Sequence, residues 1–561
     1  MNVDIFAFVE NAYNNRQLLI FFTCIFIAWF AGLFIDIMNV DAAQYASMCR
    51  EMVESGSWLQ VYDLGNEYLD KPPLTFWLGA LSFKVFGISN WAYKLPSFLF
   101  AWLAILGTYG FTRVYYDKRT SQIAALVLAS CQAIFLITND CRTDTLLMGS
   151  VSLAVWQLAE GFEKGRLQNF LLGFFAIGLA MLAKGPIGLI IPAFGFAGHF
   201  VLKKQYHNFL RWQYLPGILI IGAMLLPMCI GLYHQFDLHP EKIVNGQTGV
   251  SGLKFYFWTQ SFGRITGENA WKNDVYFLFL FQSMLWAFFP WILLFIASLL
   301  SRLQGQFNKG FRFNQVEYIS ISGFILTYCA LALSKYQLPH YIFSAFPYAS
   351  VLVASFIVKL KPSDRLLIGL AKIQYVLIFL LVAILLIASF YFFPTHNPVV
   401  TIYIVAVLLT VAAIWFRYFK LDWIAFCVLF MTAGNIIANT HLYPELLKYQ
   451  SGSVTGKILL AETFKNNRVY YYRYQATHAL HFYSQQIVPE LKDFSNLKQG
   501  DVIVTGPDGP DYLKHKNVSF QTLKKGNHYS VQLLSLPFLM PHTREQKIEP
   551  YFIVKVLLPN N

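Results

Sequence analysis

The chain has 561 residues, of which 56% are hydrophobic and only 13% are charged. Soluble globular proteins carry about 25% charged residues, so this composition excludes an ordinary soluble domain and indicates a membrane protein. The formal net charge of +13 lies mainly in loops between apolar segments, which argues against nucleic-acid binding.

Apolar segments long enough to cross a bilayer recur along the first four fifths of the chain. The first of them lacks a basic n-region and a small-residue cleavage site, which predicts an uncleaved anchor. We predict about 13 spans, at 18–35, 95–111, 123–137, 145–158, 170–182, 187–202, 215–232, 275–300, 318–333, 341–358, 366–393, 400–416 and 421–437.

Basic residues alternate between the loops that join these spans. Loops such as those with Arg113, Lys203 and Lys361 are rich in Lys and Arg, whereas the short opposite loops hold one cation or none. The positive-inside rule therefore predicts a multi-pass protein of the bacterial inner membrane with a cytoplasmic N-terminus. The same rule explains the net positive charge, because the basic residues lie in the predicted cytoplasmic loops.

Two of the predicted outer loops are long, at 36–94 and 233–274. The first begins with an amphipathic pattern that predicts a helix along the membrane surface, capped by Asp41 and ended by Gly56. Its apolar face is formed by Tyr45, Met48, Cys49, Met52 and Val53. The second loop is glycine-rich, which is typical of a mobile segment near a ligand.

The character of the sequence changes after the last span. Residues 443–561 are polar, and four runs in this region predict strands, at 468–474, 501–505, 529–534 and 551–557. We therefore predict a transmembrane domain over 1–442 and a small C-terminal α/β domain over 443–561. With thirteen spans, that second domain is periplasmic.

Ionisable residues outside the basic loops gather on the predicted periplasmic side. An ionisable residue at or within the membrane is a functional candidate by default. The set comprises Asp41, Asp70, Lys71, Arg142, Asp144, Lys184, Arg264, Lys272, Lys335 and His340.

Each of these residues also has a purely structural interpretation. Asp41 is placed to cap a helix, and Lys184 and Lys335 to reach lipid headgroups. Adjacent acids and bases, such as Asp70 with Lys71, are placed to pair with each other.

The convergence of all these ionisable residues on one face favours a binding site. Several cations suit a phosphate, and a carboxylate accepts a proton or holds sugar hydroxyls or a cation. A lipid-linked phosphosugar fits this mixture.

Five motifs carry a resemblance to a known family. They are Asp41-Ala-Ala-Gln-Tyr45, Asp70-Lys71-Pro72-Pro73-Leu74, Arg142-Thr-Asp144, Lys184-Gly185-Pro186 and Ser334-Lys335-Tyr336-Gln-Leu338-Pro339. In these motifs the chain resembles the polyprenyl-phosphate-sugar glycosyltransferases of the GT-C class. Within that class it most resembles the protein-mannosyltransferase/aminoarabinose-transferase (lipid A modifying) group. The resemblance implies a polytopic all-α GT-C membrane domain with periplasmic amphipathic helices and a small C-terminal α/β domain.

The resemblance also implies roles for individual residues. Asp41 and Asp144 match the two acids of the family's cleft, so we expect them to be catalytic. Lys71 and Lys184 match basic positions that hold the substrate phosphate or orient the acids. Tyr336 matches a tyrosine of the family's cleft, which makes it a candidate for substrate binding. The residue pattern adds further candidates for substrate binding, namely Tyr45, Arg264, Lys272, Lys335 and His340. Asp70 is a candidate ligand for a divalent cation, although the chemistry requires no cofactor.

The expected function is inverting transfer of a sugar, aminoarabinose-like or another hexose or pentose, from a polyprenyl monophosphate. The expected acceptor is lipid A or another periplasmic glycan or protein, and membrane lipids are the other partners. The alternative is a transporter or flippase of lipid-linked sugars, whose polar groups belong near the middle of the bilayer. The sequence leaves the sugar and the acceptor open.

Overall fold

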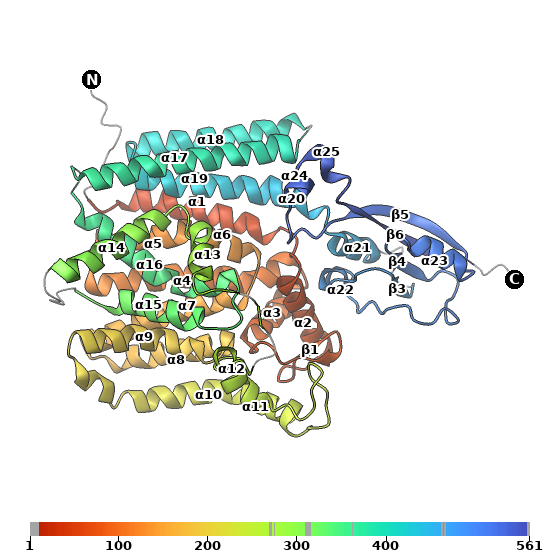
Figure 1. The fold of residues 1–561 in the computed structure, drawn as a ribbon, viewed down its shortest axis with the longest axis horizontal. Helices are drawn as coiled ribbons and strands as arrows, with labels where there is room; N and C mark the ends of the chain where they lie inside the picture. Colours follow the sequence, from red (N-terminus) through yellow and green to blue (C-terminus); the bar gives the residue numbers. More distant parts are fainter. Residues whose placement is uncertain are drawn as a thin grey trace.

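The computed structural model describes residues 11–268, 272–273, 275–308, 316–361, 363–395, 397–461, 464 and 467–557. Figure 1 shows a bundle of long helices with α2, α3, β1 and the C-terminal sheet together at one end of it. The membrane bundle and the additional elements at a single end agree with the predicted fold class.

Eight helical runs among the described residues are long and apolar enough to cross a membrane. A ninth span is formed if α5 (Lys118–Ser130) and α6 (Gln132–Asn139), which bend by 53°, are counted together. The helices within the eight runs are α1 (Asn15–Leu33), α4 (Asn90–Tyr115), α8 (Leu167–Lys184), α10 (Tyr214–Leu232), α16 (Phe346–Lys359), α17 (Arg365–Ile387), α18 (Pro398–Phe419) and α19 (Trp423–Ile437).

Other apolar helices complete the bundle. They are α7 (Thr143–Lys164), α9 (Ile187–Leu202), α13 (Phe279–Ala287), α14 (Ile292–Asn308) and α15 (Ile319–Ala332). Each of the thirteen predicted spans falls on one of these helices or on a pair of them, and the number that crosses the bilayer stays a prediction. The predicted span 275–300 is divided between α13 and α14, because the backbone between them contains Pro290, which has no N–H to donate.

The first outer loop contains the predicted surface helix, α2 (Asp41–Ser55). Its apolar face is buried, and it ends at Gly56, which adopts a φ of 72° that glycine reaches without strain. A two-stranded ribbon, β1 (Tyr62–Asp63) with β2 (Asn66–Glu67), and α3 (Leu74–Phe86) follow. The second outer loop folds into short helical turns, α11 (Gly252–Lys254), η3 (Phe255–Thr259) and α12 (Gly263–Thr266).

The C-terminal part forms a four-stranded sheet with the strand order β3-β4-β6-β5. Strand β4 pairs in parallel with β3, and β6 pairs antiparallel with β4 and β5. The helices and strands of this C-terminal part are α20 (Tyr443–Leu447), α21 (Ser451–Leu459), β3 (Val469–Tyr472), α22 (His478–Tyr483), β4 (Val502–Thr505), α23 (Gly509–His515), β5 (Phe520–His528), α24 (Leu536–Leu539), α25 (Pro541–Arg544) and β6 (Glu549–Val556).

One of the four predicted strands is wrong. The apolar run 529–534 lies after β5 rather than within a strand, and β5 is instead the polar stretch Phe520–His528. Most residues of β5 are exposed, so its side chains lack the apolar alternation that marks a strand in sequence. The last membrane run also extends to Leu447, beyond the predicted domain boundary at 442.

Helices α4 and α7 pack closely because a glycine lies where they approach. A Cβ atom on Gly107 of α4 would lie 2.6 Å from the backbone carbonyl carbon of Ser152 on α7. Gly222 of α10 is also helical, but a Cβ atom there would meet nothing within 4 Å. The two glycines therefore form a matched pair, one required by packing and one not.

We expect Gly107→Leu to destabilise the protein and Gly222→Leu to leave it near wild type. Overpacking at a closely packed helix contact costs about 1–3 kcal/mol. The thermal unfolding midpoint of each purified variant in detergent measures this effect. Equal midpoints for the two variants would contradict the close approach of α4 and α7.

Candidate active site

A buried ion pair joins two membrane helices at the centre of the site. Lys184 is the last residue of α8, which ends because Gly185 turns the chain at a φ of 85°. Pro186 directly precedes the next helix, α9. The ammonium group of Lys184 donates to Asp144, in the first turn of α7. The Asp144 side chain is only 2% exposed and that of Lys184 16%, so each charge depends on the other.

The two outer loops meet above this pair. The ammonium group of Lys71 lies 2.6 Å from the Asp70 carboxylate, as one structural interpretation of the sequence predicted. The side-chain amide of Gln260 donates to the backbone oxygen and to the carboxylate of Asp70, each at 2.6 Å. The Gln260 oxygen accepts from Arg264 at 3.0 Å. Gln260 therefore fixes Asp70 of the first loop against Arg264 of the second.

Tyr341 ties the second loop to the buried pair. Its hydroxyl accepts from the Arg264 guanidinium at 2.7 Å, and the Lys184 ammonium lies 3.9 Å from the centre of its ring. His340 places Nε2 3.7 Å from Asp144, and the Arg264 guanidinium lies 5.3 Å from the centre of the Tyr336 ring. Aromatic faces near cations stabilise positive charge in a site sheltered from water.

Asp41 does not cap α2, contrary to the structural interpretation of the sequence. It is the first residue of α2, and its side chain makes no capping hydrogen bond. Its carboxylate instead accepts from Arg142 at 2.5 Å, and Arg142 also donates to Asp140 at 2.8 Å. The Asp41 side chain is 35% exposed. Arg142 and Asp144, although only two positions apart in the sequence, therefore have different partners.

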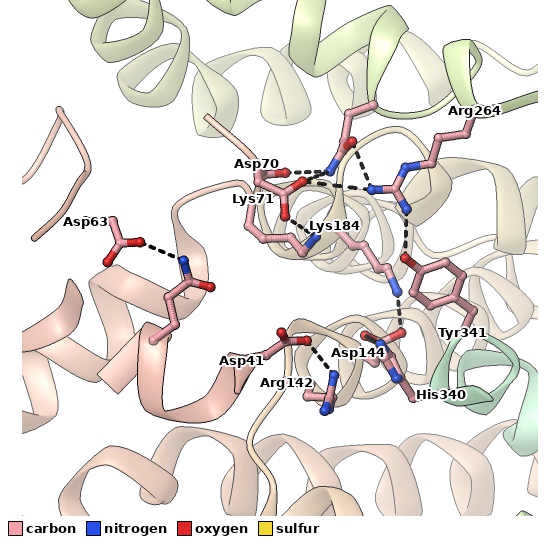
Figure 2. Close-up of polar contacts among 12 residues, drawn as sticks. Asp41, Asp63, Asp70, Lys71, Arg142, Asp144, Lys184, Arg264, His340 and Tyr341 are labelled. Atoms are coloured by element: carbon pink, nitrogen blue, oxygen red, sulfur yellow. Dashed lines mark hydrogen bonds and ion pairs between the residues drawn. The ribbon is translucent and has the colours of Figure 1, made fainter. Parts of the chain in front are cut away.

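Figure 2 shows that these side chains surround one space. Asp41 and Arg142 lie on one side of it, Asp70 and Lys71 on another, and Lys184 with Asp144 between them. The same elements bring Tyr45 within electrostatic range of Asp41, Asp70 and Asp144. Three acids, Asp41, Asp70 and Asp144, thus share one space with several cations from distant parts of the chain.

A cavity of about 190 Å³ opens beside the cations. Lys71, Lys184 and Arg264 lie in its wall together with Gln260 and Tyr341. The rest of the wall is largely apolar and includes Pro72, Leu147, Ile187, Ile190, Phe194, Phe262, Ile265, Ala330 and Leu331. A smaller cavity of about 30 Å³ shares Lys71 and Lys184 and reaches Asp70. The larger cavity is therefore amphipathic, with positive charge beside an apolar surface.

Charge compensation sets the protonation of the loop residues. Burial opposes the charged form of Asp70, but Lys71, Arg264 and Gln260 stabilise it more, so its pKa lies below the usual range. Burial and then the Asp41 carboxylate raise the pKa of Tyr45 well above its usual range, so the phenol keeps its proton. Asp70 is therefore a permanent anion that holds the cations in place.

The structure places two predicted cations elsewhere. Lys272 is exposed, and Lys335 is exposed with its ammonium 3.4 Å from the backbone oxygen of Thr266. Neither belongs to the wall of the two cavities described above. The position of a motif along the chain therefore does not establish which of its side chains line a cavity.

Sequence reasoning also missed residues that hold the site together. Asp140 lies two positions before Arg142. An acid so close to a predicted site motif could have been recognised from the sequence as a candidate. Gln260 is a neutral residue in an aromatic stretch, and nothing local distinguishes it. Its contact with Asp70 spans 190 positions, which only the fold brings together.

Asp70 was also predicted as a candidate metal ligand. Within the part of the chain that the structure describes, His, Cys, Asp and Glu form no group of three that could hold a metal ion. The two Asp70 carboxylate oxygens are engaged by Lys71 and Gln260. A divalent cation at Asp70 stays a prediction.

Comparison with known proteins places this geometry in context. Residues 70–230 match the model of the Dolichyl-phosphate-mannose-protein mannosyltransferase family. The chain is 23% identical over 309 residues to undecaprenyl phosphate-alpha-4-amino-4-deoxy-L-arabinose arabinosyl transferase 2 of Proteus mirabilis, covering 54% of this chain and 52% of that protein. The corresponding transferase of Wigglesworthia glossinidia brevipalpis is 24% identical over 339 residues, covering 59% and 57%. The chain thus spans about half the length of these curated relatives.

The likeness in structure extends further than the likeness in sequence. The crystal structure of ArnT from Cupriavidus metallidurans bound to undecaprenyl phosphate superimposes with a TM-score of 0.72 over 96% of this chain and 98% of that chain, at 17% identity. The chain has the GT-C fold. This likeness confirms the predicted fold, and the resemblance in sequence is to the family and the relatives named above.

We expect Asp144→Asn to destabilise this GT-C protein strongly. Removing one partner of a buried ion pair leaves the other charge uncompensated, which costs about 3–5 kcal/mol. The thermal unfolding midpoint in detergent should fall well below that of wild type.

Asp511→Asn is the control for this measurement, because the Asp511 side chain is 77% exposed in its ion pair with Lys514. Its midpoint should match that of wild type. An Asp144→Asn midpoint equal to that of the control would contradict the buried pair.

Proposed function

We propose that the protein is an integral-membrane glycosyltransferase that moves a sugar from a polyprenyl monophosphate to a lipid A-type or other periplasmic acceptor. The observation that carries this proposal is the amphipathic cavity, in which Lys71, Lys184 and Arg264 meet an apolar wall. A polyprenyl phosphate has the matching chemistry, an anionic head on a hydrocarbon chain. The names of the relatives and the fold shared with ArnT support the same donor class.

The donor would bind with its phosphate at the three cations and its polyprenyl chain along the apolar wall. Arg264 is held by Gln260 and Tyr341, and Lys184 by Asp144. These cations are therefore positioned before the donor arrives. Preorganised positive charge stabilises the negative charge that develops on the leaving phosphate.

The transfer step would form a bond from an acceptor oxygen to the anomeric carbon of the sugar. The bond from that carbon to the phosphate oxygen breaks, and its electron pair stays on the phosphate. If the acceptor is a hydroxyl, Asp41 is placed to take its proton, because its carboxylate is partly exposed and is held in position by Arg142. If the acceptor is already a phosphate, no base is needed and Asp41 positions it instead.

Asp144 has a different part in this scheme. Its side chain is buried and bound to Lys184, so it holds a phosphate-binding cation rather than receiving a proton from the acceptor. In this proposal, Asp41 is the acid nearest the acceptor, and Asp144 is the acid that positions Lys184.

The proposed location is the bacterial inner membrane, with the N-terminus cytoplasmic and the C-terminal domain periplasmic. The basic loops of the sequence support this orientation. Helix α2, which begins with Asp41, and the C-terminal sheet lie at the same end of the bundle (Figure 1). This arrangement would put both on the side where envelope glycans are modified.

Asp41→Asn should abolish transfer from a labelled polyprenyl-phosphate sugar to lipid A. The variant keeps the size of the side chain but loses the charge that accepts a proton or pairs with Arg142. Product formation by purified protein, followed by mass spectrometry, measures this, with Asp511→Asn as the exposed control. Full activity of Asp41→Asn would exclude its role. Movement of lipid-linked sugar across proteoliposomes without any modified acceptor would favour a transporter.

Arg264→Gln should raise the KM for the donor by about tenfold, since a charge-assisted hydrogen bond to phosphate contributes roughly 1.5–3 kcal/mol. Lys254→Gln removes an exposed cation of the same outer loop and should leave the KM unchanged. Steady-state kinetics at fixed acceptor concentration measure both. Equal effects of the two substitutions would mean that the loop attracts the donor only through its general charge.

A further inference from the structure

The polar site continues along α2 beyond Asp41. Gln44 lies three residues further on, so it occupies the same face of the helix one turn away, with Cβ atoms about 5–6 Å apart. Its side-chain amide donates to the Asp63 carboxylate at 2.7 Å. Figure 2 shows this contact on the side of the site opposite Arg264.

The C-terminal domain contributes the next group. Nε2 of His478, the first residue of α22, lies 2.9 Å from one Asp63 carboxylate oxygen and 3.2 Å from the other. Gln44, Asp63 and His478, here called the α2–α22 trio, thus come from the surface helix, the β1–β2 ribbon and the C-terminal domain. They bring three separate elements to the edge of the site.

The trio is not needed to attach the C-terminal domain. Helix α22 is already anchored on the first outer loop by buried apolar side chains. Ala479 and Phe482 belong to the same apolar cluster as Met48 and Phe83, and the Phe482 and Phe83 rings stack at 6.0 Å. An ion pair that is partly exposed adds little to such an interface.

The trio remains accessible to a ligand. The Asp63 side chain is 18% exposed and that of His478 23%. A carboxylate offers about four acceptor positions, so the contacts from Gln44 and His478 leave Asp63 able to accept more. The trio therefore combines partly satisfied acceptors with fixed positions, which suits binding to hydroxyl groups.

Charge distinguishes the two ends of the site. The cavity end has Lys71, Lys184 and Arg264, which suit a phosphate. The α2 end has the carboxylates of Asp41 and Asp63, and its cation Arg142 is already paired with Asp41 and Asp140. A phosphate bound directly against Asp63 would meet like charge. Uncharged hydroxyls meet no such repulsion and can donate to both Asp63 and the Gln44 oxygen.

We propose that the α2–α22 trio is a subsite for saccharide hydroxyls of the acceptor, and that the C-terminal domain takes part in acceptor binding through His478. This inference rests on the proposed function, because it assigns the acceptor to the α2 end and the donor phosphate to the cavity end. Asp41 lies between the two, where the acceptor oxygen meets the sugar.

The test compares acceptor binding and donor binding in full-length protein held in nanodiscs. The variants are His478→Ala and Asp63→Ala, with His515→Ala as the control, since His515 is an exposed histidine of the same domain. The probes are fluorescently labelled lipid A and undecaprenyl phosphate. Loss of a hydrogen bond to a charged group predicts an acceptor Kd weakened by about tenfold in both test variants. The donor Kd and the control should match wild type.

Three results would overturn the inference. They are an unchanged acceptor Kd in both test variants, an equal weakening of acceptor and donor binding, and no binding of lipid A by wild type. An equal weakening would indicate a general structural role, which the thermal unfolding midpoint of each variant would also reveal. If wild type binds lipid A through the trio but transfers no sugar to it, the proposed function fails and the subsite stands.

Discussion

The site depends on the compensation of one buried charge. Lys184 ends a membrane helix where water is scarce, and its ammonium group is stable there because Asp144 of the neighbouring helix carries the opposite charge. This pair fixes the ends of α7 and α8 relative to each other. The outer loops then add Lys71 and Arg264 around it, held by Asp70, Gln260 and Tyr341. The three cations are compensated by two carboxylates, because Asp144 pairs with Lys184 and Asp70 faces both Lys71 and Arg264.

The result is a site with two chemically different ends. At one end, three cations border an apolar cavity, which matches an anionic lipid. At the other, Asp41 and Asp63 present carboxylates beside the C-terminal domain. The inverting transfer proposed here needs this separation, because the donor's phosphate must be attracted where it leaves and the acceptor must approach from elsewhere. The C-terminal domain then forms part of the site's edge.

Much of this arrangement was predictable from the sequence, for identifiable reasons. Apolar runs locate membrane helices because the bilayer imposes their length, and the α2 amphipathic pattern ended correctly at Gly56. The cleft cations Lys71, Lys184 and Arg264 were found because charges near a membrane are costly.

What could not be predicted is pairing across the fold. The Asp70–Gln260 and Asp63–His478 contacts join residues 190 and 415 positions apart. Lys335 belongs to a predicted site motif, yet its side chain is exposed and its ammonium group contacts the backbone oxygen of Thr266. The exposed strand β5 has no apolar alternation to reveal it.

The most direct test of the central claim is an experimental structure of the protein with undecaprenyl phosphate, determined by cryo-electron microscopy in nanodiscs. The account predicts density for the phosphate within hydrogen-bonding distance of Lys71, Lys184 and Arg264, with the polyprenyl chain along the apolar wall of the cavity. Phosphate density beside Asp41 and Asp63, or at the opposite end of the bundle, would contradict it.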